Sequence, residues 1–348
     1  MRILVWLSWW VDSAVSAGLL LEQWHEVVGG FMINYIADEW DCPTETDLME
    51  AKKVATHLWI ELYTFDYREE YERRIIAYIY SEYEKWRTPN PDVFCNNLIK
   101  FDIFMEEALG LWFDAIATGH YAQIKHVDTE YILKKWIDPE KDQSYFLSRL
   151  TEYQRSHAIF PIGHLKKSEV RVIAERMSLP NAKRKDSQWL CFIGKVSMKE
   201  FLEKRISKKP GNILDMNGKI IGEHDGAFSY TIGQRKWIGV GGGPARFVVE
   251  KNVKNNTITV GWDEDIELYK NTLIATEWLW SSKNPPPLPY VGKWKIRYRQ
   301  EDQDVTIDSW DNNCIHVTFL HPQRAITNGQ IFTLYSPDGF LLWSGIIE

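Results

Sequence analysis

The sequence has few cysteines, no long hydrophobic run and no excess of positive charge. Its 348 residues include only 4 cysteines, too few for a disulfide framework and typical of a reducing cytoplasm. No run of about 18 apolar residues predicts a membrane span, and the first residues lack the pattern of a signal peptide. The net charge of −7 excludes a uniformly basic coat for nucleic acid but allows a local basic patch. We therefore expect a cytoplasmic protein of two or three domains, at about 150 residues each.

Glycine is absent from a short stretch near the start of the chain. Residues 8–13, Ser-Trp-Trp-Val-Asp-Ser, stand between an apolar run at 3–7 and an apolar helical stretch at 14–21. A strand, tight loop and helix in this order direct free backbone N–H groups and the helix dipole at a phosphate. Such loops use glycine because it accepts positive φ and lets the backbone approach the phosphate. From these residues alone, the stretch is a phosphate loop or a plain corner between strand and helix.

Tryptophan is abundant, with 17 residues in the chain. Two of them, Trp9 and Trp10, occupy the phosphate-loop stretch, where Ser8, Asp12 and Ser13 are the residues able to contact phosphate oxygens or a metal. Others stand where a glycine would end a helix or form a turn: Trp24, Trp59, Trp86, Trp112, Trp189 and Trp237. An altered sequence whose fold frame survives is one explanation of this pattern.

Strand and helix patterns alternate up to about residue 190. Apolar segments predict strands at 26–32, 60–65 and 114–118, and helical spacing predicts helices at 44–58, 67–85 and 96–109. Thr44 is a candidate N-cap for the first of these helices. This alternation predicts an α/β fold with a parallel sheet covered by helices on both faces. Because ligands bind at the carboxyl ends of such strands, Ser8, Met32 and Gly119 are expected to share one crevice.

Two cysteines stand in settings that favour a thiolate. Cys95 follows two prolines and Asp92 just before a predicted helix, and Cys191 follows the cations at 183–185. The alternatives are a rigid turn with a buried cysteine for the first and a core cysteine under a solvated basic loop for the second. Residues 141–147, Lys-Asp-Gln-Ser-Tyr-Phe-Leu, give a polar start to an apolar helix, which is either a site or simply a capped helix.

Short strands dominate the rest of the chain. Residues 205–265 predict a small β unit, with a hairpin turn at Asn217-Gly218 and a flexible glycine-rich loop at 239–244. Residues 270–348 predict a small antiparallel barrel. In the segment 293–299 four cations alternate with Trp294, Ile296 and Tyr298, so the cations share one strand face. This face is either a stripe that binds the phosphate backbone of nucleic acid or a solvated edge.

Six motifs occur in the order typical of one family. They are the frame at residues 8–13, Asn-Pro-Asp at 90–92 with Cys-Asn at 95–96, residues 118–122, residues 141–147, residues 185–194, and residues 231–236. With the final Gly-Ile-Ile-Glu they make the chain resemble the tRNA-specific 2-thiouridylase family (MnmA/TrmU) over its whole length. The resemblance implies a PP-loop ATP pyrophosphatase-type catalytic domain at 1–200, a small central β-rich domain at 205–265 and a C-terminal β-barrel domain at 270–348.

The resemblance also implies an activity, ATP-dependent 2-thiolation of the wobble uridine of tRNA. ATP, accompanied by Mg²⁺, would adenylate the C2 oxygen of the uridine and release pyrophosphate. Cys191 would carry a persulfide loaded by a cysteine desulfurase or a sulfur-relay protein, and Cys95 would discharge it and leave a Cys95–Cys191 disulfide. Asp92 would be the general acid/base near the base.

The remaining site residues are carried over from the same resemblance. The ATP site would comprise Trp6, Leu7, Ser8, Trp9, Trp10, Val11, Asp12, Ser13, Met32 and Gly119. The tRNA site would comprise Asn90, Pro91, Asp92, His120, Lys141, Asp142, Gln143, Arg297, Tyr298 and Gln330. No protein ligand set for a resident metal is predicted.

Two other classes of protein fit parts of this pattern. Another PP-loop ligase would share the loop without needing both cysteines. A catalytically impaired tRNA-binding protein of the same fold would keep the frame and lose the ATP site. Because of Trp9 and Trp10, we predict weak or absent ATP binding, caused by the bulk of the indoles together with a positive-φ penalty.

Overall fold

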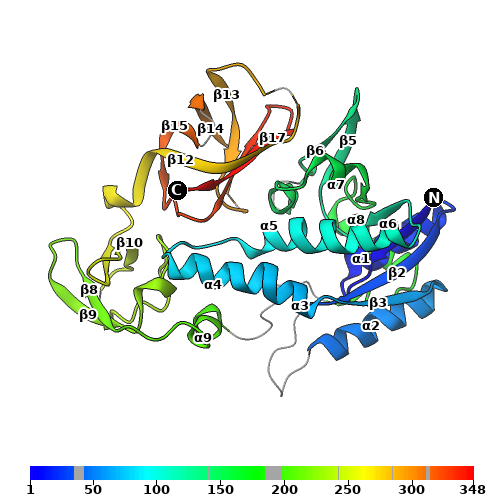
Figure 1. Cartoon of the computed structure of the whole chain (residues 1–348), viewed down its shortest axis with the longest axis horizontal. Helices are drawn as coiled ribbons and strands as arrows, with labels where there is room; N and C mark the ends of the chain where they lie inside the picture. The colour runs from blue at the N-terminus through cyan, green and yellow to red at the C-terminus, as the bar shows by residue number, and fades with distance from the viewer. Residues whose placement is uncertain are drawn as a thin grey trace.

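The described residues form one parallel sheet, one small mixed sheet, one closed barrel and one hairpin, which follow one another along the chain in Figure 1 with the hairpin inserted in the first unit. The computed structural model describes residues 1–34, 43–138, 141–184, 197–241, 243–283, 285–298, 300–310 and 314–348. This architecture confirms the predicted fold class, a parallel α/β unit followed by two β-rich units. In the described ranges, the helices are all too short or too polar to cross a membrane.

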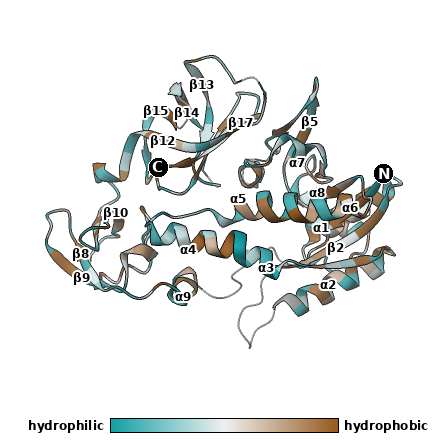
Figure 2. Cartoon of the chain, in the orientation of Figure 1, coloured by the Kyte–Doolittle hydropathy of each residue, from teal (hydrophilic) through white to brown (hydrophobic). Residues whose placement is uncertain are grey.

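The parallel sheet has five strands in the order β3-β2-β1-β4-β7. Its central strand exposes alternate residues to opposite faces: Ile3 and Val5 join one apolar cluster, and Leu4 joins the other. Both faces are therefore buried, as predicted, and strands such as β2 are largely hydrophobic in Figure 2. The strands are β1 (Arg2–Trp6), β2 (Glu26–Ile33), β3 (Leu62–Asp66), β4 (Ala115–Ala117) and β7 (Ala158–Ile159).

Helices from different parts of the chain cover the two faces. One cluster combines the sheet with α1 (Val11–Glu22), α2 (Pro43–Leu58) and α8 (Lys167–Arg176). The other combines it with two long segments whose helical parts are α3 (Arg68–Tyr71), a π-helical stretch (Glu72–Ile76), α4 (Ala77–Glu84), α5 (Pro91–Cys95), a second π-helical stretch (Asn96–Ile103) and α6 (Phe104–Gly110).

Three predicted helix boundaries are wrong. The helix expected from residue 96 begins at Pro91, because Asn90 caps it by accepting the Val93 N–H and proline needs no hydrogen-bond acceptor at a first helical position. Thr44 lies inside α2 and is not its N-cap, since α2 starts at Pro43. Residues 141–147 form only a short 3-10 helix, Ser144–Leu147.

The connecting and middle elements are short. They are the hairpin β5 (Gln123–Val127) and β6 (Glu130–Lys134), α7 (Glu152–Ser156), α9 (Met198–Glu203), β8 (Gly211–Leu214), β9 (Ile220–His224), the 3-10 helix Ala227–Ser229, β10 (Phe247–Asn252), β11 (Thr257–Gly261) and the 3-10 helix Ile266–Leu268. Strands β8 and β9 form the predicted hairpin, with Gly218 in its turn at φ +78°.

The last strands close into the predicted barrel, in the order β12-β15-β14-β13-β16-β17. Trp294 and Trp343 are fully buried in its core. The strands are β12 (Tyr269–Trp280), β13 (Tyr290–Lys295), β14 (Gln303–Trp310), β15 (Cys314–Arg324), β16 (Ile331–Tyr335) and β17 (Leu341–Ile347).

The predicted stripe of four cations is wrong. Strand β13 ends at Lys295, so Arg297 lies beyond the strand, and Arg299 lies outside the described residues. Lys295 is 3% exposed and faces Asp142 at 3.7 Å. Lys293 pairs with Asp304 at 2.7 Å. Lys293 and Lys295 share a face, as period-two alternation requires, and Asp142 from another part of the chain lies against Lys295.

Candidate active site

The phosphate-loop stretch folds as strand, loop and helix, as predicted. Ser8 follows β1 and Ser13 lies in the first turn of α1, and both side chains are buried. The Ser13 hydroxyl accepts the Ser8 N–H at 3.1 Å and lies 3.0 Å from the Ser8 hydroxyl. These bonds close the loop on itself and fix the start of α1.

Gly119 lies against this loop, as predicted. A Cβ at position 119 would come within 2.7 Å of the Ser13 nitrogen, so only glycine allows the end of β4 to approach so closely. Met32 is buried near the end of the neighbouring strand β2. The carboxyl ends of β1, β2 and β4 thus meet at one edge of the sheet, where this fold class binds its ligands.

Trp9 and Trp10 stack on each other, with ring centroids 3.5 Å apart. The Arg184 guanidinium lies 4.0 Å from the centre of a Trp9 ring, and Asn181 donates its amide to the Trp9 carbonyl at 3.1 Å. Both tryptophans lie in the described range and neither has positive φ; Trp10 is extended, at φ −78°. The predicted positive-φ penalty is therefore wrong here, because the loop adopts a conformation open to any residue. The other reason given for weak ATP binding, the bulk of the two indoles, remains.

A lysine that was not predicted from the sequence reaches the loop from α8. The Lys167 ammonium donates to Asp12 Oδ1 at 2.6 Å, and the Tyr121 hydroxyl donates to the same oxygen at 2.6 Å. Tyr121 belongs to a motif noted in the sequence, residues 118–122, but Lys167 stands in no such motif. The interaction places one cation and one carboxylate beside the loop.

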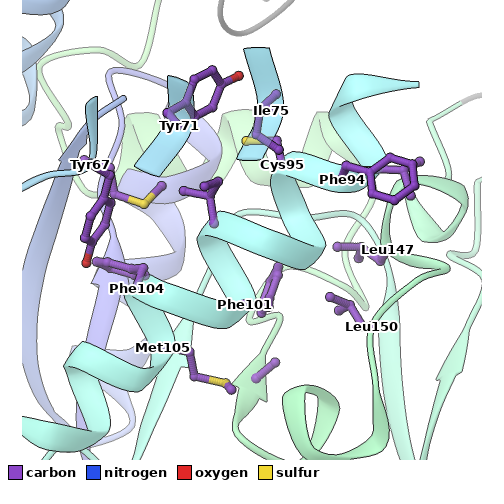
Figure 3. Close-up of a cluster of buried hydrophobic side chains, with 14 of the residues drawn as sticks. Tyr67, Tyr71, Ile75, Phe94, Cys95, Phe101, Phe104, Met105, Leu147 and Leu150 are labelled. Carbon is purple, nitrogen blue, oxygen red and sulfur yellow. The ribbon is translucent and has the colours of Figure 1, made fainter. Parts of the chain in front are cut away.

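The second part of the site is the helix that begins at Pro91. Cys95 is 6% exposed and lies among apolar side chains, beside Ile75 in Figure 3. It occupies the second turn of the helix, whereas the helix dipole acts mainly within the first turn. The expected effect of the helix N-terminus on this thiol is therefore not supported.

Asp92 and His120 share one buried lysine as an electrostatic neighbour. Burial raises the pKa of Asp92, and the charge of Lys100 partly offsets this rise. Burial, reinforced by Lys100, lowers the pKa of His120 well below its ordinary value, so the imidazole is neutral. Lys100 is 6% exposed, and its ammonium lies 3.8 Å from the centre of a Trp6 ring. Lys100 was not predicted from the sequence, although a lysine between Ile99 and Phe101 in an apolar helix is an available signal.

The ring of His120 forms part of the protein interior. It lies 2.7 Å from the Thr118 hydroxyl through Nδ1, and its centroid is 6.1 Å from that of Phe101 and 5.9 Å from that of Phe160. Asp142 is also buried, and it accepts the backbone N–H groups of Trp136 and Ser144 at 3.1 Å each. Both residues were expected to contact tRNA, and both are buried in this structure.

The barrel holds the segment that precedes Pro91. Gln330 donates its amide to the carbonyls of Thr88, at 2.8 Å, and Pro89, at 3.1 Å. The Tyr145 hydroxyl donates to the Ile331 carbonyl at 3.0 Å. Gln143 accepts the Tyr121 N–H at 2.9 Å. These bonds bring the barrel, residues 88–92 and residues 141–147 together. All three regions contain residues that were expected to contact tRNA.

Arg297 and Tyr298 lie beyond the end of β13. Arg297 donates to the Ala325 carbonyl at 2.6 Å and lines an open pocket of about 450 Å³ with Arg324 and His321. The Tyr298 ring packs on Phe146, with centroids 4.5 Å apart. Two guanidiniums thus line one pocket, and that of Arg324 is paired with Asp263 at 2.6 Å. Lys141, the remaining expected tRNA contact, is half-buried.

Cys191 and Trp189 lie outside the described residues. The described chain that leads toward them ends at Arg184, whose guanidinium covers Trp9. The chain thus runs past the phosphate loop shortly before Cys191.

Comparison with known proteins gives matches along nearly the whole chain. Residues 1–195 match a tRNA methyl transferase HUP domain, residues 199–262 a tRNA methyl transferase PRC-barrel domain and residues 270–347 an aminomethyltransferase beta-barrel domain. A tRNA-specific 2-thiouridylase of Alkaliphilus oremlandii is 42% identical over 352 residues, covering 99% of this chain and 96% of its own. The corresponding enzyme of Halalkalibacterium halodurans is 43% identical over 343 residues, covering 97% and 92%. That of Coxiella burnetii is 43% identical over 342 residues, covering 96% and 94%.

Proposed function

The chain belongs to the tRNA-specific 2-thiouridylase family, and we propose that it transfers sulfur to C2 of the wobble uridine of tRNA in an ATP-dependent reaction. The observation that carries this proposal is the helix with Asp92 in its first turn and Cys95 in its second, whose preceding loop is held by Gln330 of the barrel. A thiol and a half-buried carboxyl on one anchored helix provide a nucleophile and a proton-transfer group a turn apart.

ATP would bind with its phosphates at residues 8–13. The start of α1 offers backbone N–H groups, and Lys167 offers a cation beside them. The Asp12 carboxylate fits Mg²⁺, a hard cation that takes one or two carboxylates and the phosphate oxygens of a nucleotide. The C2 oxygen of the uridine would attack the α-phosphorus, and pyrophosphate would leave. C2 then bears adenylate, a better leaving group than oxide.

Sulfur would enter from a persulfide on Cys191. The terminal sulfur attacks C2 and AMP departs; the Cys95 thiolate attacks the Sγ of Cys191, breaking the sulfur–sulfur bond and leaving sulfur on C2. The two electrons needed come from the two cysteines, which end as a disulfide and require a cellular thiol for reduction. A cysteine desulfurase or a sulfur-relay protein would supply the persulfide.

The buried groups around Asp92 would control proton transfer. Burial raises the pKa of Asp92, which is the direction expected of a carboxyl that acts as a general acid. Neutral His120 would shape the pocket wall, and Arg297 and Tyr298 would contact tRNA from the barrel. Asn90, Pro91 and Lys141 would meet the RNA near the flipped base.

A thiolation assay with matched cysteine variants tests the proposal. The protein is incubated with tRNA, ATP, Mg²⁺ and a loaded desulfurase, and 2-thiouridine is measured by mass spectrometry of the digested tRNA. Cys95→Ser should abolish 2-thiouridine yet leave the persulfide on Cys191. Cys314→Ser, in barrel strand β15, is the control and should retain activity. Extra sulfur on Cys42 or Cys314 with Cys191 unmodified would contradict the assignment.

A second function is favoured by the stacked pair Trp9–Trp10. If the indoles exclude the triphosphate, the chain acts as a tRNA-binding protein of the same fold that performs no adenylation. Calorimetric titration with ATP, alongside titration with tRNA, separates the two functions. Binding of tRNA without ATP supports the second function, and binding of both supports the enzyme.

A further inference from the structure

Helix α1 ends in a hydrogen-bonded motif that ordinarily requires glycine. Trp24 follows its C-cap with φ +64°. The Trp24 N–H donates to the Leu21 carbonyl at 3.0 Å, and the His25 N–H donates to the Leu20 carbonyl at 3.1 Å. This pair of bonds defines the Schellman motif, whose left-handed residue is usually glycine because a Cβ clashes there.

Three more helices end in the same way with tryptophan at the same position. Trp59 after α2, Trp86 after α4 and Trp112 after α6 have φ values of +57°, +63° and +64°. In each, the tryptophan N–H donates to the carbonyl three residues back and the next N–H to the carbonyl five residues before itself, at 2.9–3.3 Å. Four helices thus carry the bulkiest side chain at the position that most favours the smallest.

Packing explains at most one of the tryptophans with positive φ, Trp86, which is partly buried against an apolar cluster. A fifth tryptophan, Trp237, has φ +67° in a loop. The side chains of Trp24, Trp59, Trp112 and Trp237 are between 86% and 95% exposed. Of the ten non-glycine residues with positive φ in the described ranges, these five are half. Asparagine and aspartate enter this region through local hydrogen bonds, but tryptophan has no such aid.

Trp294 shows the opposite behaviour. It lies in strand β13, is fully buried, and stacks on Phe319 with centroids 4.2 Å apart. Its backbone needs no left-handed conformation, and its ring fills the barrel core. The chain therefore contains two kinds of tryptophan position, one suited to the indole and one suited to glycine.

We propose that the codon at positions 24, 59, 86, 112 and 237 is UGA, and that the cell that makes this protein reads UGA as glycine. UGA differs by one base from the tryptophan codon UGG and by one base from the glycine codon GGA. It stands for tryptophan in some genetic codes and for glycine in others. The first meaning gives the sequence with tryptophan at these positions, and the second gives the residue that the backbone requires.

Reading UGA as glycine would also change the sequence of the phosphate loop. With glycine at positions 9 and 10, the loop becomes Ser-Gly-Gly-Val-Asp-Ser, and the stacked indoles are gone. This extension to the loop rests on the proposed function, because the backbone there has no positive φ to support it. The assignment of the five positions rests on the backbone alone and is independent of any activity.

The gene and the protein made in its own cells test the proposal directly. We expect UGA at the five positions and UGG at position 294. Peptide mass spectrometry of the endogenous protein should show glycine at 24, 59, 86, 112 and 237, each peptide lighter by the difference between the two residues, and tryptophan at 294. UGG codons at the five positions, or tryptophan in those peptides, would overturn the proposal.

Unfolding in urea gives a second, independent measurement. The chain with tryptophan at the five positions is compared with a variant in which all five are Trp→Gly, and with Trp294→Gly as control. We expect the five-glycine variant to unfold at higher urea concentration than the tryptophan chain, and the control at lower concentration. A five-glycine variant that is no more stable would show that the backbone does not require glycine. Neither measurement depends on ATP or tRNA, so the thiolation proposal fails or stands separately.

Discussion

The two sides of the candidate site differ in what holds them in place. On the side of Asp92 and Cys95, the helix is capped by Asn90 and its preceding loop is bound by Gln330 from the barrel. On the phosphate side, residues 8–13 bond to one another and also to Tyr121, Lys167 and Asn181, and the stretch carries two stacked indoles. Both sides are thus held by contacts distant in sequence, but only the phosphate side depends on which residues occupy positions 9 and 10. This difference predicts which substitutions act through stability and which act through a ligand.

Removing Lys295 should have the largest effect, because it lies where the barrel meets residues 141–147. Lys295→Met removes a buried cation 3.7 Å from the buried carboxylate of Asp142, and removing one partner of a buried ion pair costs about 3–5 kcal/mol. Urea denaturation measures the change. Lys293→Met, which breaks a more exposed ion pair on the same strand, is the control and should cost less than about 1 kcal/mol. Equal destabilisation by the two variants would show that the cysteine side does not depend on this buried ion pair.

The sequence predicted this barrel strand but not the burial of its lysine. Alternation assigns residues to two faces of a strand, yet it does not reveal what covers a face, and here Asp142 from a distant segment does so. The parallel sheet was predictable because its strands are continuous apolar runs separated by helices. The start of α5 at Pro91 was missed because proline was read as the end of a turn, although Asn-Pro is also a helix-start signal.

The residues of the candidate site, like the fold, were only partly predictable from the sequence. Motifs short in sequence, such as residues 90–95, identify groups that one helix brings together. Lys167 and Lys100 were missed because each acts on a residue from another element, across distances in sequence that no local pattern spans. The glycine-like tryptophans were recognised at helix ends, where the caps fix the backbone. They were misjudged in the phosphate loop, where the backbone relaxes to negative φ.

Replacing the loop tryptophans should give the next largest effect. Trp9→Gly with Trp10→Gly removes the stacked rings from residues 8–13. We expect ATP to bind at least about tenfold more tightly, a gain of about 1.4 kcal/mol or more, as measured by calorimetry. Trp112→Gly, at a helix end, is the control and should leave ATP affinity unchanged. Micromolar ATP affinity in the chain with both tryptophans would show that the loop binds phosphate despite them.

Neutralising Lys100 tests how its charge affects Asp92, and we expect a smaller effect than from replacing the loop tryptophans. Burial raises the pKa of Asp92, and Lys100 opposes this rise because a nearby cation favours the carboxylate. Lys100→Gln removes the opposing charge, so the pKa of Asp92 rises further and the limb of the pH–rate profile that it controls moves to higher pH. Lys125→Gln, on exposed strand β5, is the control and should not move that limb. If the limb does not move in Lys100→Gln, Asp92 is not the group that transfers the proton in the rate-determining step.

The smallest expected effect concerns the exposed face of the barrel. Removing one side chain that binds a phosphate should lower the slope of log affinity for tRNA against log salt by about one unit. Lys295 is buried and cannot bind phosphate, and Lys293 is already paired with Asp304, so Lys293→Ala should change the slope by less than about one unit. Arg297→Ala, in the pocket shared with Arg324, should lower it by about one unit. Asp304→Asn, which releases Lys293 from its partner, should not lower the slope. If Lys293→Ala lowers the slope as much as Arg297→Ala does, the strand face binds RNA after all, and the barrel contacts tRNA over a wider surface than the pocket.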